Sequence, residues 1–181
     1  MSKSMIGILF MVPFWVQSQV VESNRVNISV SIPEIAMIDL APSTSTIELS
    51  LRPPRQAGDP VDMSQANNDS KWMNYTSSIA PKGPKKNITA QILSGSLPQG
   101  LHLSLRAGKY TGSGKGKQGN PRKDIILSNL PQVIVKNIGG AYSGKGVQHG
   151  HQLFFSLGYK KYENIDFGVT TIVIAFTLTD N

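Results

Sequence analysis

The stretch Val26–Ile32, with the sequence VNISVSI, alternates apolar and polar residues without a break. In an extended chain Val26, Ile28, Val30 and Ile32 lie on one side, and the asparagine and serines between them lie on the other. A period of two residues is typical of a half-buried β-strand, whereas an amphipathic helix repeats every 3.6 residues. The pattern therefore predicts an all-β fold.

The same alternation, or a short continuous apolar run, recurs along the rest of the chain. The further predicted strands lie at Ile47–Leu51, Ile88–Ile92, Leu101–Leu105, Val133–Val135, Leu153–Leu157 and Val169–Asn181. Proline and glycine clusters separate these runs, and beyond residue 18 no window longer than about ten residues shows a helical period. We expect an antiparallel β-sandwich of about eight strands in a single domain.

The first residues have the pattern of an export signal. Lys3 supplies the positive charge, Met5–Val16 the apolar run, and the small residues up to Ser18 a cleavage site. The apolar run is shorter than the roughly 20 residues that a membrane-spanning helix needs, which disfavours an uncleaved anchor. We predict a signal peptide at residues 1–18, a sandwich domain at residues 19–181, and an exported protein in the periplasm, on the outer cell surface or outside the cell.

The amino-acid composition excludes some kinds of catalytic and metal site. The chain has no cysteine, which excludes disulfides, thiol catalysis and cysteine-ligated metals. Its net charge is +7, and removing residues 1–18 takes away Lys3 and no carboxylate, which leaves +6. This balance favours anionic partners such as lipopolysaccharide or acidic glycans, with nucleic acid not expected for an exported protein. The alternative is that the charge only keeps the protein soluble.

Two glycine-rich stretches resemble phosphate-binding loops. They are TGSGKGKQGN at residues 111–120 and GGAYSGKGVQHG at residues 139–150. A phosphate-binding loop must open into a helix, but strand-like sequence follows both stretches, and Gly146 stands where a P-loop needs Ser or Thr. We therefore expect no nucleotide. Because both stretches combine a tyrosine with Gly-Lys-Gly, we predict two equivalent hairpin loops.

No motif for catalysis or metal binding is present. His149 and His151 are two residues apart, and His102 could complete a three-histidine site, but exposed polar histidines are the simpler interpretation. The aspartates of the loop at residues 59–69 lack the spacing of a calcium site. There is no G-x-S-x-G or H-E-x-x-H, although a triad built from distant residues stays open. We expect a protein that is not an enzyme and has no cofactor or metal.

Loop tyrosines offer an alternative binding function. Tyr110 and Tyr142 could stack on sugar rings, and Lys115 and Lys145 could neutralise acidic groups on the same glycan. Trp72, in contrast, is expected in the core, where large aromatic residues are generally found. A lectin-like module for anionic glycans is thus the second hypothesis for the function.

Five stretches carry a resemblance to a known class. They are IPEIAMIDL (32–40), KWMNYTSS with ITAQI (71–78 and 88–92), SLPQGLHLSLRA (96–107) and GVTTIVIAFTLTDN (168–181). They resemble exported β-sandwich proteins of Gram-negative bacteria, namely fimbrial subunits and spore-coat-like secreted subunits, from about Val26 to Asn181. The resemblance implies an Ig-like or fimbrial-type sandwich and a non-catalytic structural subunit of a surface assembly. Many such fimbrial subunits carry a cysteine pair, which this chain lacks.

The resemblance suggests strand exchange as the means of assembly. Val26, Ile28, Val30 and Ile32 would fill apolar pockets on another copy, or on another surface subunit, while the backbone extends that partner's sheet. The alternative is that this strand closes its own sandwich, which is the default for a complete set of strands. The sequence leaves both arrangements open.

Overall fold

A computed structural model describes residues 25–43 and 46–181. The compact unit within it spans Pro33–Asn181, and residues 25–32 do not belong to that unit. The predicted signal peptide at residues 1–18 lies outside the described residues. Among those described, no helix is long enough and apolar enough to cross a membrane.

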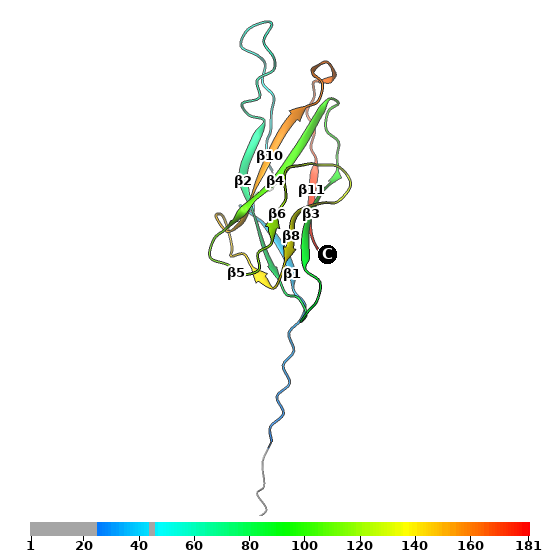
Figure 1. The fold of residues 1–181 in the computed structure, drawn as a ribbon. Helices are drawn as coiled ribbons and strands as arrows, with labels where there is room; N and C mark the ends of the chain where they lie inside the picture. The colour runs from blue at the N-terminus through cyan, green and yellow to red at the C-terminus, as the bar shows by residue number, and fades with distance from the viewer. Residues whose placement is uncertain (1–24, 44–45) are drawn as a thin grey trace, which may run out of the picture. The chain divides into compact units, whose positions relative to one another are not determined.

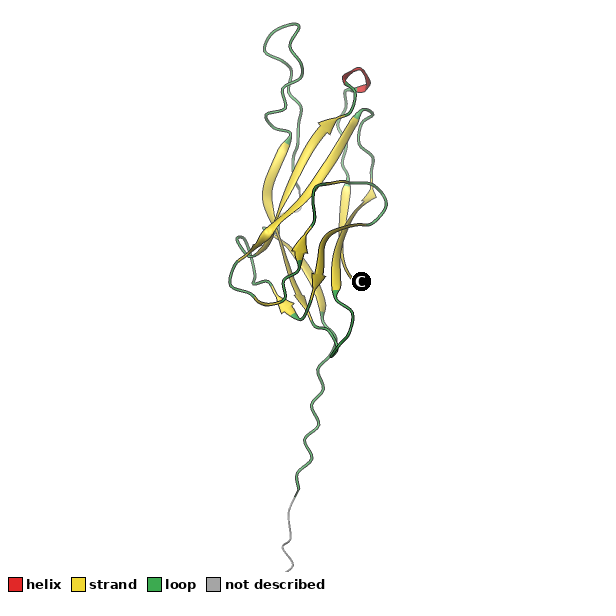
Figure 2. Cartoon of the chain, in the orientation of Figure 1, coloured by secondary structure: helices red, strands yellow, loops and turns green. Residues whose placement is uncertain are grey.

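The compact unit is an antiparallel β-sandwich of two sheets, which confirms the predicted fold class (Figure 2). The larger sheet has the order β5-β9-β2-β10-β4-β7, with β1 also paired to β2, and the smaller sheet has the order β11-β3-β8-β6. The larger sheet contains β1 (Ala36–Ala41), β2 (Asn67–Ser77), β4 (Leu101–Thr111), β5 (Lys115–Gly116), β7 (Ile125–Ile126), β9 (Ala141–Tyr142) and β10 (Gly150–Tyr159). The smaller sheet contains β3 (Lys86–Ser94), β6 (Asn120–Pro121), β8 (Gln132–Ile138) and β11 (Val173–Asp180). A single 3-10 turn, η1 (Tyr162–Asn164), precedes β11.

The core lies between the two sheets (Figure 1). Its fully buried side chains include Met73 of β2, Leu105 of β4 and Leu153 of β10 from the larger sheet. Ile88 of β3 and Ile134 of β8 meet them from the smaller sheet. These five residues come from strands of seven to eleven residues, which bury one face each and so hold the sheets together.

The expected number of strands, about eight, is wrong, since the described residues contain eleven. Four of the strands, β5, β6, β7 and β9, have only two residues each and carry too little sequence for a periodicity to register. The predicted strands within 86–94, 101–111, 132–138, 150–159 and 173–180 are confirmed.

Two segments with clear alternation form no strand, contrary to prediction. Residues 26–32 form no strand, and neither do residues 47–51. In the second segment Ile47 and Leu49 pack against the core, and the Ser50 N–H donates a hydrogen bond to the Gln65 carbonyl at 3.1 Å. Alternation indicates that a segment can pair, but it does not supply a neighbouring strand edge.

The two glycine-rich loops pair with each other, so the expectation of two separate hairpins is wrong. Lys115 of β5 lies opposite Tyr142 of β9, and neither loop joins two strands that pair together. The approach is close, because a Cβ atom on Gly114 would lie 2.0 Å from the Tyr142 carbonyl oxygen. Glycine here permits close packing of two backbones.

Candidate functional site

Among the described residues, one long edge of β11 has no strand paired to it. β11 pairs with β3 along its whole length, from Val173 opposite Ser94 to Asp180 opposite Lys86. Among residues 25–43 and 46–181, no strand pairs with its other edge. β1 contacts β11 but belongs to the other sheet. The backbone N–H and C=O groups along this edge are therefore available to another strand.

The core is incompletely covered along the same side. Among the described residues, eight of the eleven partly buried apolar side chains that pack against the core lie on β1, at residues 47–49 or at residues 172–178. On β11 these are Ile174, Phe176 and Leu178, which alternate as the inward face of a strand should. Inward-facing residues of a closed sandwich are normally fully buried. The apolar side chains of β1 and β11 that pack against the core are therefore still partly exposed.

The segment at residues 25–32 has the complementary property. Val26, Ile28, Val30 and Ile32 are between 76 and 84% exposed, although each is a β-branched apolar residue that favours a half-buried strand. Four exposed apolar side chains at alternate positions of one short segment form an unusually continuous apolar surface. The four residues predicted from the sequence to take part in strand exchange thus lie uncovered in this structure.

The chain that follows this segment is held firmly. The Ser78 N–H donates to the Ile35 carbonyl at 2.8 Å, and the Ile35 N–H donates back to the Ser78 hydroxyl oxygen at 2.6 Å. The same hydroxyl donates to the Pro33 carbonyl at 3.3 Å. These bonds fix the backbone at Pro33–Ile35, immediately after the exposed segment.

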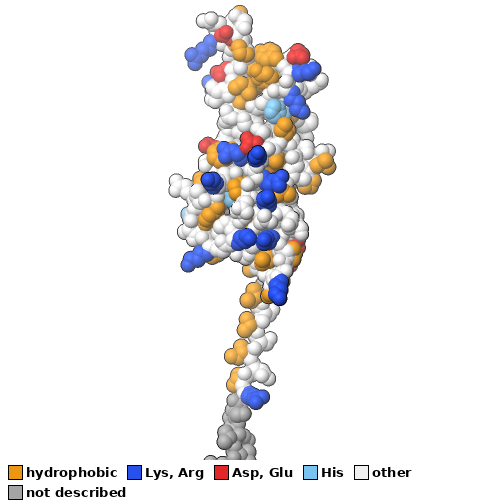
Figure 3. Space-filling model, in the orientation of Figure 1, with side chains coloured by type: hydrophobic (Ala, Val, Ile, Leu, Met, Phe, Trp, Pro, Cys, Tyr) orange, Lys and Arg blue, Asp and Glu red, His pale blue; other side chains and the backbone are white. Residues whose placement is uncertain are grey.

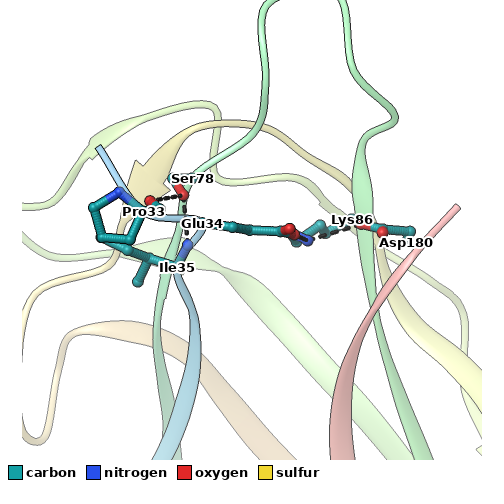
Figure 4. Close-up of polar contacts among 6 residues, drawn as sticks. All are labelled: Pro33, Glu34, Ile35, Ser78, Lys86 and Asp180. Atoms are coloured by element: carbon teal, nitrogen blue, oxygen red, sulfur yellow. Dashed lines mark hydrogen bonds and ion pairs between the residues drawn. The ribbon is translucent and has the colours of Figure 1, made fainter. Parts of the chain in front are cut away.

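A buried lysine holds the same end of the sandwich. Lys86 is only 4% exposed, and its ammonium group lies between the carboxylates of Glu34 and Asp180, as Figure 4 shows. The distance to Asp180 Oδ1 is 2.8 Å. The hydrogen bonds that the Lys86 ammonium group donates to Asp180 and Glu34 raise the Lys86 pKa above its usual value. One cation thus joins the residues before β1, the start of β3 and the end of β11.

Sequence reasoning missed Lys86 and did not recognise β11 as an edge. The alternation of Ile174, Phe176 and Leu178 was visible, but it indicates only which face is apolar and not which neighbour is absent. No sequence signal distinguishes Lys86 from the adjacent Lys85, because its burial depends on two carboxylates that are distant along the chain.

The four residues suggested for glycan binding do not form one cluster of free side chains. Lys115 and Tyr142 are exposed and lie opposite each other in β5 and β9, and Lys145 is exposed in the following loop. Tyr110 is half-buried, its hydroxyl donates to the Ser143 carbonyl at 3.2 Å, and its ring meets His151 edge-on. Tyr110 therefore does not present a free ring face in the way that Tyr142 does.

His151 is a fully buried part of the core. Its Nδ1 donates to the Gly108 carbonyl at 2.8 Å, its Nε2 lies 3.2 Å from the Tyr75 hydroxyl, and the two rings stack. Burial lowers the pKa of His151, and burial likewise raises the pKa of Tyr75. In the part of the chain that the structure describes, no three His, Asp or Glu side chains are placed to hold a metal ion.

Comparisons of the chain with protein-family models, with curated proteins and with solved structures find no match.

Proposed function

We propose that the chain is a non-enzymatic structural subunit of a cell-surface or fimbria-like assembly, which polymerises by strand exchange. Residues 25–32 of one copy add to the free edge of β11 in the next copy. Their apolar side chains cover the partly exposed apolar side chains of β1 and β11, and their backbone extends the smaller sheet. The observation that carries this proposal is the uncovered row on β11, together with the exposed alternating row at residues 26–32.

The two surfaces match in length and in period. Residues 25–32 and β11 both contain eight residues, which corresponds to about 26 Å of extended chain in each. Both place an apolar side chain at every second position, so a single register buries the whole row from each side. Addition of a strand to an exposed sheet edge is a common mode of recognition, in which the main chain supplies hydrogen bonds and alternate pockets supply specificity.

Pairing within one copy is less favourable for this chain. To lie beside its own β11 in the smaller sheet, the segment would have to change sheets within the short connection at Pro33–Ile35, because β1, which follows directly, is paired to β2 in the larger sheet. The backbone at Ile35 is in addition already bonded to Ser78. Exchange between copies needs no such change of sheet.

Disulfide trapping tests the proposal without background, because the chain has no cysteine. We expect a variant with Ser29→Cys and Thr177→Cys to form a ladder of disulfide-linked multimers on oxidation. Both positions lie at the middle of their segments and on the polar side, so they approach each other whether the strands run parallel or antiparallel. The matched control combines Ser29→Cys with Lys109→Cys on the larger sheet, and we expect no ladder from it.

Three outcomes separate the alternatives. A ladder specific to the first pair supports exchange between copies. A monomer in which both thiols are consumed shows that the segment pairs with its own β11, and contradicts the proposal. Equal ladders from the test and control pairs indicate random collision, and also contradict it. Electron microscopy of surface material from cells that express the chain then shows whether the linked copies form filaments.

A further inference from the structure

The charges of this chain are strongly segregated along the sequence. Between Lys82 and Lys145 there are eleven lysines and arginines and a single carboxylate, Asp124. The rest of the compact unit, residues 33–81 and 146–181, has nine carboxylates and five basic residues. The fold therefore gathers most of its positive charge on the elements from β3 to β9.

Within this region, five exposed cations follow β8 and form what we call the basic stripe: Lys85, Lys117, Arg122, Lys123 and Lys136. The Arg122 N–H donates to the Ile134 carbonyl, Lys136 is on β8 itself, and the Lys117 carbonyl accepts from the Gly139 N–H. These anchor points span residues 134 to 139, so the stripe runs for about 17 Å along the strand. Figure 3 shows lysine and arginine side chains gathered over this part of the molecule.

One end of the stripe lies in a shallow depression of about 640 Å³ beside β6 and β8. Arg122, Lys123 and Lys136 line it, together with Asp124. Asp124 does not neutralise them, because it faces Arg106 of β4, whose Nε lies 3.4 Å from its Oδ1. Three cations thus surround one concave surface that the nearby carboxylate leaves unbalanced.

At the other end, two lysines approach each other. Lys85 precedes Lys86, which lies opposite Ile138 of β8, and the Lys117 carbonyl accepts from the Gly139 N–H one residue further on. A side-chain hydrogen bond with Lys85 and the charge of Lys85 lower the pKa of Lys117. Among the described residues, no member of the stripe forms an ion pair with a carboxylate. Five cations without counter-charges repel one another, and an anionic partner relieves that repulsion.

We propose that the basic stripe is a binding surface for an acidic polysaccharide. A line of charges matches an extended polymer with regularly spaced sulfate or carboxylate groups better than it matches a single small anion. No aromatic side chain lines the depression, whereas proteins that bind single-stranded nucleic acid stack bases on aromatic rings. The site differs from the one suggested by the sequence, since it uses neither loop tyrosine and neither Lys115 nor Lys145.

The test compares two variants of equal net charge. In the stripe variant Lys117, Arg122 and Lys136 are each replaced by Gln, and in the control variant Lys109, Lys160 and Lys161 are each replaced by Gln. All six positions are exposed, so neither variant opens the core. Binding of the full-length chain is measured against heparin, against polygalacturonate and against DNA at several salt concentrations, with circular dichroism to verify folding.

We expect the stripe variant to bind heparin at least tenfold more weakly and to show a shallower salt dependence, because fewer counterions are released from the polymer. The control variant should stay within about threefold of the parent chain, since its charges lie away from the stripe. Equal losses in both variants would mean that net charge alone governs binding, and would overturn the proposal. Tighter binding to DNA than to either polysaccharide would overturn it in favour of nucleic acid.

Discussion

Trimming one side chain of the exposed segment gives a quantitative test of strand exchange. Ile28 is 82% exposed in the described structure and becomes buried in the proposed assembly. Ile28→Ala removes three carbon atoms, worth about 2.4 kcal/mol at about 0.8 kcal/mol for each buried methylene. Because about 1.4 kcal/mol corresponds to a factor of ten, association between copies should weaken about 50-fold. Ile28→Val removes one carbon atom and should weaken it about fourfold.

Sedimentation equilibrium over a range of protein concentrations measures these changes directly. The matched control is Ser29→Ala, which lies on the polar side of the same segment and should change association by less than about twofold. Thermal unfolding of the isolated copies should not follow the series, because Ile28 lies outside the compact unit. A Ser29→Ala effect as large as that of Ile28→Ala would refute the reasoning, since the buried face would then be misassigned.

Three further predictions concern the sandwich itself. Replacing both Glu34 by Gln and Asp180 by Asn leaves the buried Lys86 ammonium group without a counter-charge and should lower the unfolding free energy by about 3 kcal/mol in a urea titration. In the same titration Lys86→Met should cost less than half of that, because it leaves only the two exposed carboxylates unpaired. Burial lowers the pKa of His151, so the stability that its neutral form contributes is complete above the unfolded pKa of about 6.5 and declines as the pH falls below that value. The drop in Tm between pH 7.5 and pH 5 should therefore be smaller in His151→Phe than in the parent chain. Gly150→Ala places a Cβ atom 2.0 Å from the Met73 carbonyl oxygen at a φ of +82° and should lower the unfolding free energy by more than about 2 kcal/mol. Gly146→Ala, at a φ of +91° in open space, should lower the unfolding free energy by about 1 kcal/mol, as measured by denaturant unfolding.

The alternation of apolar residues predicted the strands whose neighbours are present. Each of these strands has a clear apolar row that faces the core between the two sheets; they are β3, β4, β8, β10 and β11. β2 was not predicted from alternation, although it pairs with three other strands. Its buried residues include Asn74, whose side-chain amide bonds to Gly146 and His149, so polar groups occupy positions where periodicity requires apolar ones.

The opposite error at residues 26–32 has a physical cause that matters for function. The sequence of that segment is the clearest strand pattern in the chain, yet the described structure gives it no sheet to join. Periodicity depends on the residues of the segment alone, whereas pairing also needs the free edge of another strand. The sequence does not show whether that strand belongs to the same copy or to another one. The sequence therefore predicted the residues of the inserting segment, 26–32, in the proposed exchange. It could not predict the receiving strand, because only the structure shows that β11 lies at the edge of its sheet.

The position of the basic stripe leads to a last prediction, which combines strand exchange with polysaccharide binding. In the order β11-β3-β8-β6, the proposed strand exchange would occupy one edge of the smaller sheet, and the stripe lies towards the other. An assembled chain would consequently repeat the stripe once in every copy, and one long polysaccharide could contact several stripes. Binding through linked sites typically gains a factor of about 10² to 10⁴ over a single site.

We therefore expect Ile28→Asp, which cannot bury a charge in the acceptor and so remains monomeric, to bind long heparin chains at least 100-fold more weakly than the assembled parent. Its binding to a short heparin fragment that covers one stripe should equal that of the parent, because the stripe itself is unchanged. Surface plasmon resonance with the two heparin lengths measures both values. If Ile28→Asp lost the short fragment as well, the stripe and the exchange edge would not be independent. If it kept full affinity for the long chains, the copies would not present their stripes to one polymer.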